Sequence, residues 1–209
     1  MIPRHQTILF IVLLVASIVM GTVLWTTLDR AHKRLLESEN STPTQAPLVA
    51  PAEQATLMMA NDADNSVTAR VLSLPLPQNP EDRARAVLGK LLDLYAAPGS
   101  THQIAGGANS IDQVFLAPIA DSNGKTTPGG PELAVVNLAG AFAASHPSGL
   151  ETETLTILSI CATLHANLPD VTEVRFLVDG QPRATLAGHA DLTRTYLTAD
   201  TVPIEGAHP

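Results

Sequence analysis

Aromatic side chains and cations are scarce in this chain of 209 residues. Phe, Trp and Tyr make up 3% of it, and 12 lysines and arginines stand against 20 aspartates and glutamates, which gives a net charge of −8. The first 53 residues hold four charges of each sign, so the whole acidic excess lies from Gln54 onward. Nucleic-acid binding relies on a cationic surface and on stacking rings. The composition therefore excludes a nucleic-acid partner.

Signatures of catalysis and metal binding are also missing. The single cysteine, Cys161, cannot form an internal disulfide or make a zinc site by itself. The sequence contains no G-x-S-x-G nucleophile elbow, no phosphate loop, no dinucleotide fingerprint and no H-E-x-x-H pair. We therefore assign no catalytic residue, no cofactor-binding residue and no metal ligand, and we predict a protein that is not an enzyme.

Four histidines in the acidic part remain as candidates for chemistry, and none is paired at the spacing of metal ligands: His102, His146, His165 and His189. Cys161 and His165 lie four residues apart on one helix face, but two ligands do not make a metal site. We interpret Cys161 as a thiol in the core and His165 as an imidazole that binds the last carbonyls of its helix. His189 is interpreted as stabilising a turn.

Two glycine pairs and one pair of carboxylates have structural interpretations. Gly106-Gly107 and Gly129-Gly130 lack the preceding strand and the following helix N-terminus that a phosphate loop requires. Glu151 and Glu153 fall in the first turn of a predicted helix. Capping and the helix dipole explain carboxylates at that position without acid–base chemistry.

The N-terminal segment contains a long apolar run. Residues 6–28 include no charge, and these 23 residues are enough for a helix to cross a bilayer core of about 30 Å. We predict a tail at 1–6, a transmembrane helix at 7–28 with Trp25 at an interface, and a basic juxtamembrane helix at 29–39. A cleaved signal peptide is a poorer match because a small-x-small cleavage site is lacking. A buried soluble helix is the third interpretation.

Charge alone leaves the orientation of this span open. Arg4 and the α-amino group precede it, whereas Arg30, Lys33 and Arg34 follow it. Counted literally, the positive-inside rule favours a cytoplasmic C-terminus. Residues 40–54 then carry three evenly spaced prolines and no apolar periodicity, which predicts an extended linker.

Two helices are predicted after the linker. The sequence Asn79-Pro80-Glu81-Asp82 is typical of a helix start, because Asn accepts from free N–H groups, Pro tolerates the first position and acids favour the positive end. Apolar residues then recur at helical spacing until Pro98-Gly99. Ser148 and Glu151 form a capping box for a second helix, which ends before Pro169.

Strand-like runs lie around these helices at 55–61, 67–74, 113–120, 133–138 and 172–179. The last is the clearest, since apolar side chains alternate along residues 174–178. Asp179-Gly180 predicts a turn into a returning strand at 183–186, and residues 121–131 predict a long exposed loop. The order β-β-α-β-β-α-β-β predicts an α+β fold in which two helices pack on one face of a small mixed sheet.

The second helix and the strand after it resemble the C-terminal signature of the GerMN domain family. The matching residues are Thr163-Leu164, Pro169-x-Val171 and Val174-x-Phe176-x-Val178-Asp179-Gly180. Earlier pieces are also similar: Leu91-Leu92 ahead of Pro98, and Ala134 to Leu138, with Asn137 where an acid is common. Leu57-Met58 replaces the aromatic residue typical of the first strand. The resemblance covers residues 55–196, which leaves a tail at 197–209.

This resemblance implies an extracytoplasmic module of bacterial envelope and sporulation proteins, similar in fold to ring-building motifs and without attributed catalytic residues. It therefore favours a cytoplasmic N-terminus, against the charge count. We expect a single-pass protein of the cell membrane whose domain contacts envelope proteins or assembles with itself.

Two other functions stay open. The first is a small-ligand or cell-wall-glycan binding domain that uses the loops around Gly106 and Gly129. The second is a hydrolase with an unrecognised site, for which His146, His189 and Asp191 are the candidate participants.

Overall fold

The computed structural model describes residue 20 and residues 52–200. The chain divides into two compact units, residues 1–49 and 50–209. The strands of the second unit are β1 (Ala52–Asn61), β2 (Ser66–Pro75), β3 (Ile111–Pro118), β4 (Glu132–Leu138), β5 (Val171–Val178) and β6 (Tyr196–Leu197). Its helices are α2 (Pro80–Ala96), α3 (Gly140–Ser145) and α4 (Leu150–Asn167), with 3-10 turns η1 (Gly107–Ser110) and η2 (Thr198–Asp200).

Residue 20 and residues 52–200 contain no helix that is both long enough and apolar enough to cross a membrane. The predicted transmembrane helix at 7–28 lies outside the described residues apart from Met20, and so does the predicted juxtamembrane helix at 29–39. The predicted linker, 40–54, extends too far, because β1 already begins at Ala52.

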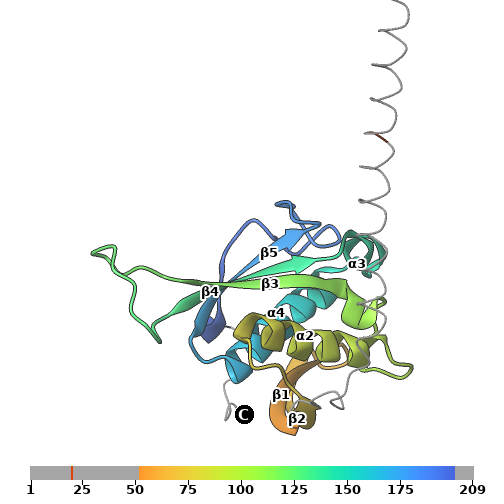
Figure 1. Ribbon diagram of the computed structural model, residues 1–209. Coiled ribbons are helices and arrows are strands. Elements are labelled where there is room, and N and C mark those ends of the chain that lie inside the picture. Colours follow the sequence, from red (N-terminus) through yellow and green to blue (C-terminus); the bar gives the residue numbers. More distant parts are fainter. Residues whose placement is uncertain (1–19, 21–51, 201–209) are drawn as a thin grey trace, which may run out of the picture. The chain divides into compact units, whose positions relative to one another are not determined.

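The strands form two sheets, which makes the predicted α+β class correct and the predicted single sheet wrong. β1 and β2 pair as an antiparallel hairpin, while the other strands form a sheet of order β3-β4-β5-β6 in which only β4 and β5 run parallel. In Figure 1 the four-stranded sheet lies above α2 and α4, and the hairpin lies below them. The two helices therefore cover one face of the sheet, as predicted, and the hairpin packs on the helices instead of extending that sheet.

The predicted start of the first helix is confirmed, whereas that of the second is wrong in detail. Asn79 caps α2 by accepting from the N–H groups of Glu81 and Asp82 at 2.9 and 3.1 Å. In α4 the N-cap is Gly149, with no side-chain cap, and the carboxylate that reaches back to its N–H is that of Glu153 at 3.2 Å. The predicted capping box of Ser148 and Glu151 therefore does not form.

The predicted returning strand at 183–186 is also wrong, and β6 closes the sheet instead. Between β5 and β6 the chain makes only isolated bridges, Val178 with Gln181 and Thr185 with Asp191. Leu186 N–H donates to the carbonyl of Ala190 at 3.0 Å, so this segment folds back on itself. The short helix α3 was not predicted.

Residues of α2, α3, α4 and both sheets share one buried cluster. Its largest fully buried side chains include Tyr95 of α2, Phe142 of α3 and Phe176 of β5. Each ring meets another at an edge-to-face angle, with His102, His146 and Tyr196 as the partners. Such contacts add to the free energy of apolar burial. The loop between β3 and β4 projects away from this core (Figure 1).

Candidate functional site

Side chains of the helices close the outer edge of β1. The backbone groups of Thr56 and Met58 point away from β2 and toward α4. Asn167 binds both groups of Thr56, accepting from the N–H at 3.0 Å and donating to the carbonyl at 2.7 Å. The hydroxyl of Thr163 accepts from the N–H of Met58 at 2.9 Å. Two side chains one helical turn apart thus take the place of a neighbouring strand.

The hydroxyl of Tyr95, in α2, continues this edge. It donates to the carbonyl of Met58 at 3.3 Å and accepts from the N–H of Ala60 at 2.7 Å, while Thr101 donates to the carbonyl of Ala60 at 2.8 Å. Burial raises the pKa of Tyr95 to about 12, which keeps the hydroxyl protonated and able to donate. Every outward N–H and C=O from Thr56 to Ala60 therefore has a partner inside the domain.

The outer edge of β2 is open. In an antiparallel ladder, residues that face each other in a non-hydrogen-bonded pair both point their backbone groups outward. The register pairs Thr56 with Val71, Met58 with Ala69 and Ala60 with Val67. Within residues 52–200, no hydrogen bond is made to the outward groups of these three β2 residues. Val71 is also 56% exposed, which is high for a large apolar side chain.

Two buried histidines meet at one hydroxyl. The Nε2 atoms of His102 and His146 lie 2.7 and 2.8 Å from Oγ1 of Thr156, and their Nδ1 atoms face the Asp62 carboxylate at 2.6 Å and the Pro147 carbonyl at 2.8 Å. Both Nδ1 atoms must donate, because those oxygens only accept. The same hydroxyl also donates to the carbonyl of Thr152 at 3.0 Å. Burial lowers the pKa of His146.

Glu153 is a fully buried carboxylate that organises the loop before β6. Its Oε2 accepts from the N–H groups of Ala187, His189 and Ala190, each at 2.9 Å, and its Oε1 faces Nδ1 of His189 at 2.9 Å. Burial alone would raise the pKa of Glu153, but these hydrogen bonds lower it to about 2. Glu153 therefore does far more than the predicted capping of its helix, and His189 stabilises the turn as predicted.

Ser148, His189 and Glu153 lie together without forming a catalytic triad. The hydroxyl of Ser148 is 3.4 Å from Nδ1 of His189, the same nitrogen that faces Glu153. A triad requires the nucleophile and the acid to bind opposite ring nitrogens, so that the imidazole can take a proton from one while it is oriented by the other. The arrangement therefore orients the ring and does not activate the serine.

The three candidate hydrolase residues are not brought together. His146 belongs to the cluster around Thr156, and His189 is held by Glu153. The Asp191 carboxylate accepts from the hydroxyl and the N–H of Thr193 at 2.6 and 2.8 Å, and these bonds lower its pKa. No pair among His146, His189 and Asp191 shares a hydrogen bond.

Cys161 and His165 also have separate environments. Cys161 is fully buried, and burial raises the pKa of its thiol, as expected for a core residue. His165 faces the carbonyl of Val171, at the start of β5, at 3.2 Å, and not the last carbonyls of α4 as predicted. The part of the chain that the structure describes holds no group of three or more His, Cys, Asp or Glu side chains able to bind a metal.

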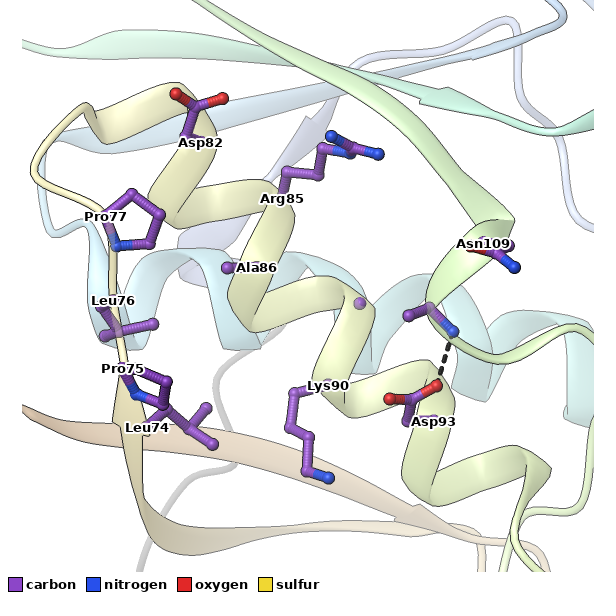
Figure 2. A pocket seen from close by; sticks show the side chains of 12 residues that line it. Leu74, Pro75, Leu76, Pro77, Asp82, Arg85, Ala86, Lys90, Asp93 and Asn109 are labelled. Atoms are coloured by element: carbon purple, nitrogen blue, oxygen red, sulfur yellow. Dashed lines mark hydrogen bonds between the residues drawn. The ribbon is translucent and has the colours of Figure 1, made fainter. Parts of the chain in front are cut away.

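A groove of about 520 Å³ runs along α2, between residues 74–77 and η1. Figure 2 shows two cations of α2 on its wall, Arg85 and Lys90. Arg85 Nε donates to the carbonyl of Ile111 at 3.4 Å, and neither cation has an acidic partner among residues 52–200. At the η1 end, Asp93 accepts from the N–H of Ala108 at 2.7 Å (Figure 2), so a carboxylate already holds the backbone donor nearest to Gly106-Gly107. A carboxylate at this position disfavours an anion beside the glycine pair.

A family model of sporulation and spore germination, Germane, matches residues 56–184. The chain belongs to the Germane family. The match covers more than half of the chain and confirms the predicted resemblance to GerMN domains. No curated protein matches this Germane chain.

Two solved structures of the sporulation protein GerM from Bacillus subtilis are similar to this Germane chain. The first GerMN domain is 14% identical, with a TM-score of 0.39 over 68% of this chain and 94% of that one. The tandem GerMN domains are 16% identical, with a TM-score of 0.41 over 71% of this chain. The alignment spans 47% of the tandem protein, about half of its length.

Several functional features of the Germane domain were missed by reasoning from sequence. The closed β1 edge depends on Asn167, which lies 111 residues from Thr56 along the chain. The cluster at Thr156 joins residues 54 and 10 positions away. No local pattern marks such pairs. The open β2 edge had a visible signal, because residues 66–75 contain one charge and only a terminal proline.

Proposed function

We propose that this Germane protein is a non-enzymatic, membrane-anchored protein of the bacterial envelope that presents its domain for protein–protein contact. The anchor is the uncharged run at residues 7–28, and the linker from residue 40 carries the domain outside the membrane. The family resemblance to extracytoplasmic modules supports this location over the one that the charge count favours.

The observation that carries the proposal is the difference between the two edges of the hairpin. The outward groups of β1 from Thr56 to Ala60 are bound by side chains of α2, of α4 and of Thr101, whereas those of Val67, Ala69 and Val71 in β2 are not bound within residues 52–200. An exposed edge of this kind pairs with an extended strand, with main-chain hydrogen bonds supplying the affinity. Protein contact through β2 requires no catalytic residue.

Sidedness and contact can be tested on the same full-length protein. A C-terminal tag should be removed by protease from spheroplasts and protected in inverted vesicles. A photoreactive amino acid placed at Val71 should give a cross-linked protein product in intact membranes. The same probe at Phe115, which is 43% exposed on a strand of the other sheet, is the matched control. Protection of the tag in spheroplasts would contradict the location, and equal products from both probes would contradict the contact.

A second function, binding of a small anionic ligand such as a cell-wall fragment, is favoured by the groove along α2. Arg85 and Lys90 line that groove together with Asp82 and Asp93, and neither cation has an acidic partner within residues 52–200. An anionic fragment should raise the melting temperature of the wild-type protein, and the shift should disappear in the double variant Arg85→Ala, Lys90→Ala. If no fragment of a cell-wall panel shifts the melting temperature of the wild-type protein, this second function is contradicted.

A further inference from the structure

The β2 edge has none of the usual features that prevent strands from pairing. Natural edge strands are protected by central charges, prolines or bulges. The β1–β2 register runs without interruption from Ala52–Pro75 to Asn61–Ser66, so there is no bulge. The one proline, Pro75, is at the end of the strand, and Arg70 is the only charge in β2. The outward backbone groups at 67, 69 and 71 thus form an accessible row.

The strand is also complementary to itself. We consider two β2 strands that pair antiparallel about a two-fold axis at Ala69. Each residue then faces the residue of the second copy that lies equally far on the other side of Ala69, so that the two residue numbers sum to 138. Val71 then lies opposite Val67 of the second copy, and Arg70 lies opposite Thr68. β-Branched pairs across strands are favourable, whereas like charges directly opposite are not. This register pairs the exposed Val71 with an apolar side chain and keeps the two arginines from facing each other.

The closed β1 edge limits such pairing to one step. Joining two hairpins through β2 gives a four-stranded sheet of order β1-β2-β2-β1, and both of its outer edges are β1 edges whose groups from Thr56 to Ala60 are already bound by side chains of the same copy. A two-stranded hairpin is marginal alone, while a larger sheet is more stable. A two-fold contact of this type closes and cannot propagate. A second copy of the chain is therefore a partner that pairs with the open β2 edge and leaves only β1 edges on the outside of the joined sheet.

We propose that two copies of this protein dimerise through antiparallel pairing of their β2 strands. This inference rests on the proposed function, because it identifies the partner of the same edge. The dimer presents the two α2 grooves and two anchors on one assembly. The six outward N–H groups at residues 67, 69 and 71 of the two copies provide its main-chain hydrogen bonds.

Cysteine cross-linking of the full-length protein in its membrane tests this arrangement. Residues facing each other in a hydrogen-bonded antiparallel pair have Cα atoms about 5.5 Å apart, which suits a disulfide. Ala69→Cys should therefore give a covalent dimer on mild oxidation, and Phe115→Cys should not. The native Cys161 is fully buried and contributes no background.

Variants of the edge test the same dimer without cross-linking. In Ala69→Pro the lost N–H points away from β1, so the hairpin keeps its internal hydrogen bonds. Two hydrogen bonds are lost per dimer, and the dissociation constant should rise about thirtyfold in analytical ultracentrifugation of the full chain in detergent. Val71→Lys should also weaken the dimer, and Phe115→Lys should leave it unchanged.

The outcomes separate this inference from the proposed function. Covalent dimers from Ala69→Cys together with a weaker dimer in Ala69→Pro support both. A disulfide between Ala69→Cys and a different protein would overturn the homodimer and leave the function standing. A full chain that stays monomeric, with no product from Ala69→Cys or from the photoreactive probe at Val71, would overturn both.

Discussion

The phenol of Tyr95, on helix α2, accepts a hydrogen bond of 2.7 Å from the backbone N–H of Ala60 on strand β1. A side chain thereby occupies the position of a neighbouring strand. The same hydroxyl donates to the carbonyl of Met58, so one oxygen serves two backbone groups of the edge. The ring is fully buried in the core at the same time. Helix packing and edge protection are thus performed by one residue.

Replacing Tyr95 with Phe should therefore cost more than the loss of a surface hydroxyl. The N–H of Ala60 would become a buried donor without a partner, a loss of about 2 kcal/mol in the free energy of unfolding. Urea denaturation measures the loss, and faster hydrogen exchange at Ala60 would locate it. Unchanged exchange at Ala60 would contradict the role assigned to the hydroxyl.

Glu153 should make stability depend on acid. Its pKa is lowered to about 2 in the folded protein from an ordinary value of 4.5. A carboxylate with a lowered pKa stabilises the fold above its unfolded pKa, and this contribution is lost as the pH falls from about 4.5 toward 2. Glu153→Gln should cost about 2 kcal/mol at pH 7 and remove that part of the acid dependence, since the amide N–H₂ would face backbone donors. Melting curves of both proteins from pH 7 to pH 3 compare them, with the exposed Glu151→Gln as control.

The hydroxyl of Thr156 should be essential to the two buried histidines. Thr156→Val keeps the shape of the side chain and leaves both Nε2 atoms without their partner, at a cost of about 3 kcal/mol. Thr154→Val, on the exposed side of the same helix, should change stability by less than about 0.5 kcal/mol. Urea denaturation of both variants and the wild type measures these changes. Equal stability of Thr156→Val and the wild type would contradict the role assigned to the hydroxyl.

The cap of α2 gives a prediction of ordinary size. Asn79→Ala removes the oxygen that accepts from two N–H groups in the first turn and should lower the free energy of unfolding by about 1 kcal/mol. Asn79→Asp keeps the acceptor and should stay close to the wild type. Equal stability of Asn79→Ala and the wild type in chemical denaturation would show that the cap contributes nothing.

Features encoded by neighbouring residues could be predicted, and features made by distant ones could not. The Asn79 start and the alternation along β5 depend on residues within one turn or one strand, and both are confirmed. The strand expected at 183–186 does not form, and Glu153, 34 residues before Ala187, binds three backbone N–H groups in the residues directly after it, where the chain folds back. The predicted capping box of α4 is also wrong. The sequence offers two glutamates, and the motif selects Glu151, whereas the structure uses Glu153 to bind the N–H of Gly149.

The candidate site could be predicted only in part, because the scarcity of charge and proline in residues 66–75 marks a strand without edge protection but does not show that its edge is open. The open edge of β2 is recognised only once the outward groups of β1 are known to be bound, and their partners lie on α2 and α4. A strand pattern predicts that an edge exists but not which edges are covered. The acidic composition bears on the class of partner and contains no information on strand order.

The closed edge of β1 has a consequence for the order of events during synthesis. The N–H groups of Met58 and Thr56 bind side chains that lie 105 and 111 residues later in the chain. A nascent domain emerges from its N-terminus, and contacts of large sequence separation form late. The β1 groups that Thr163 and Asn167 bind therefore lack these partners until α4 has been made. A nascent chain that has not yet reached α4 is therefore prone to association, and the rate of elongation sets how long this state lasts.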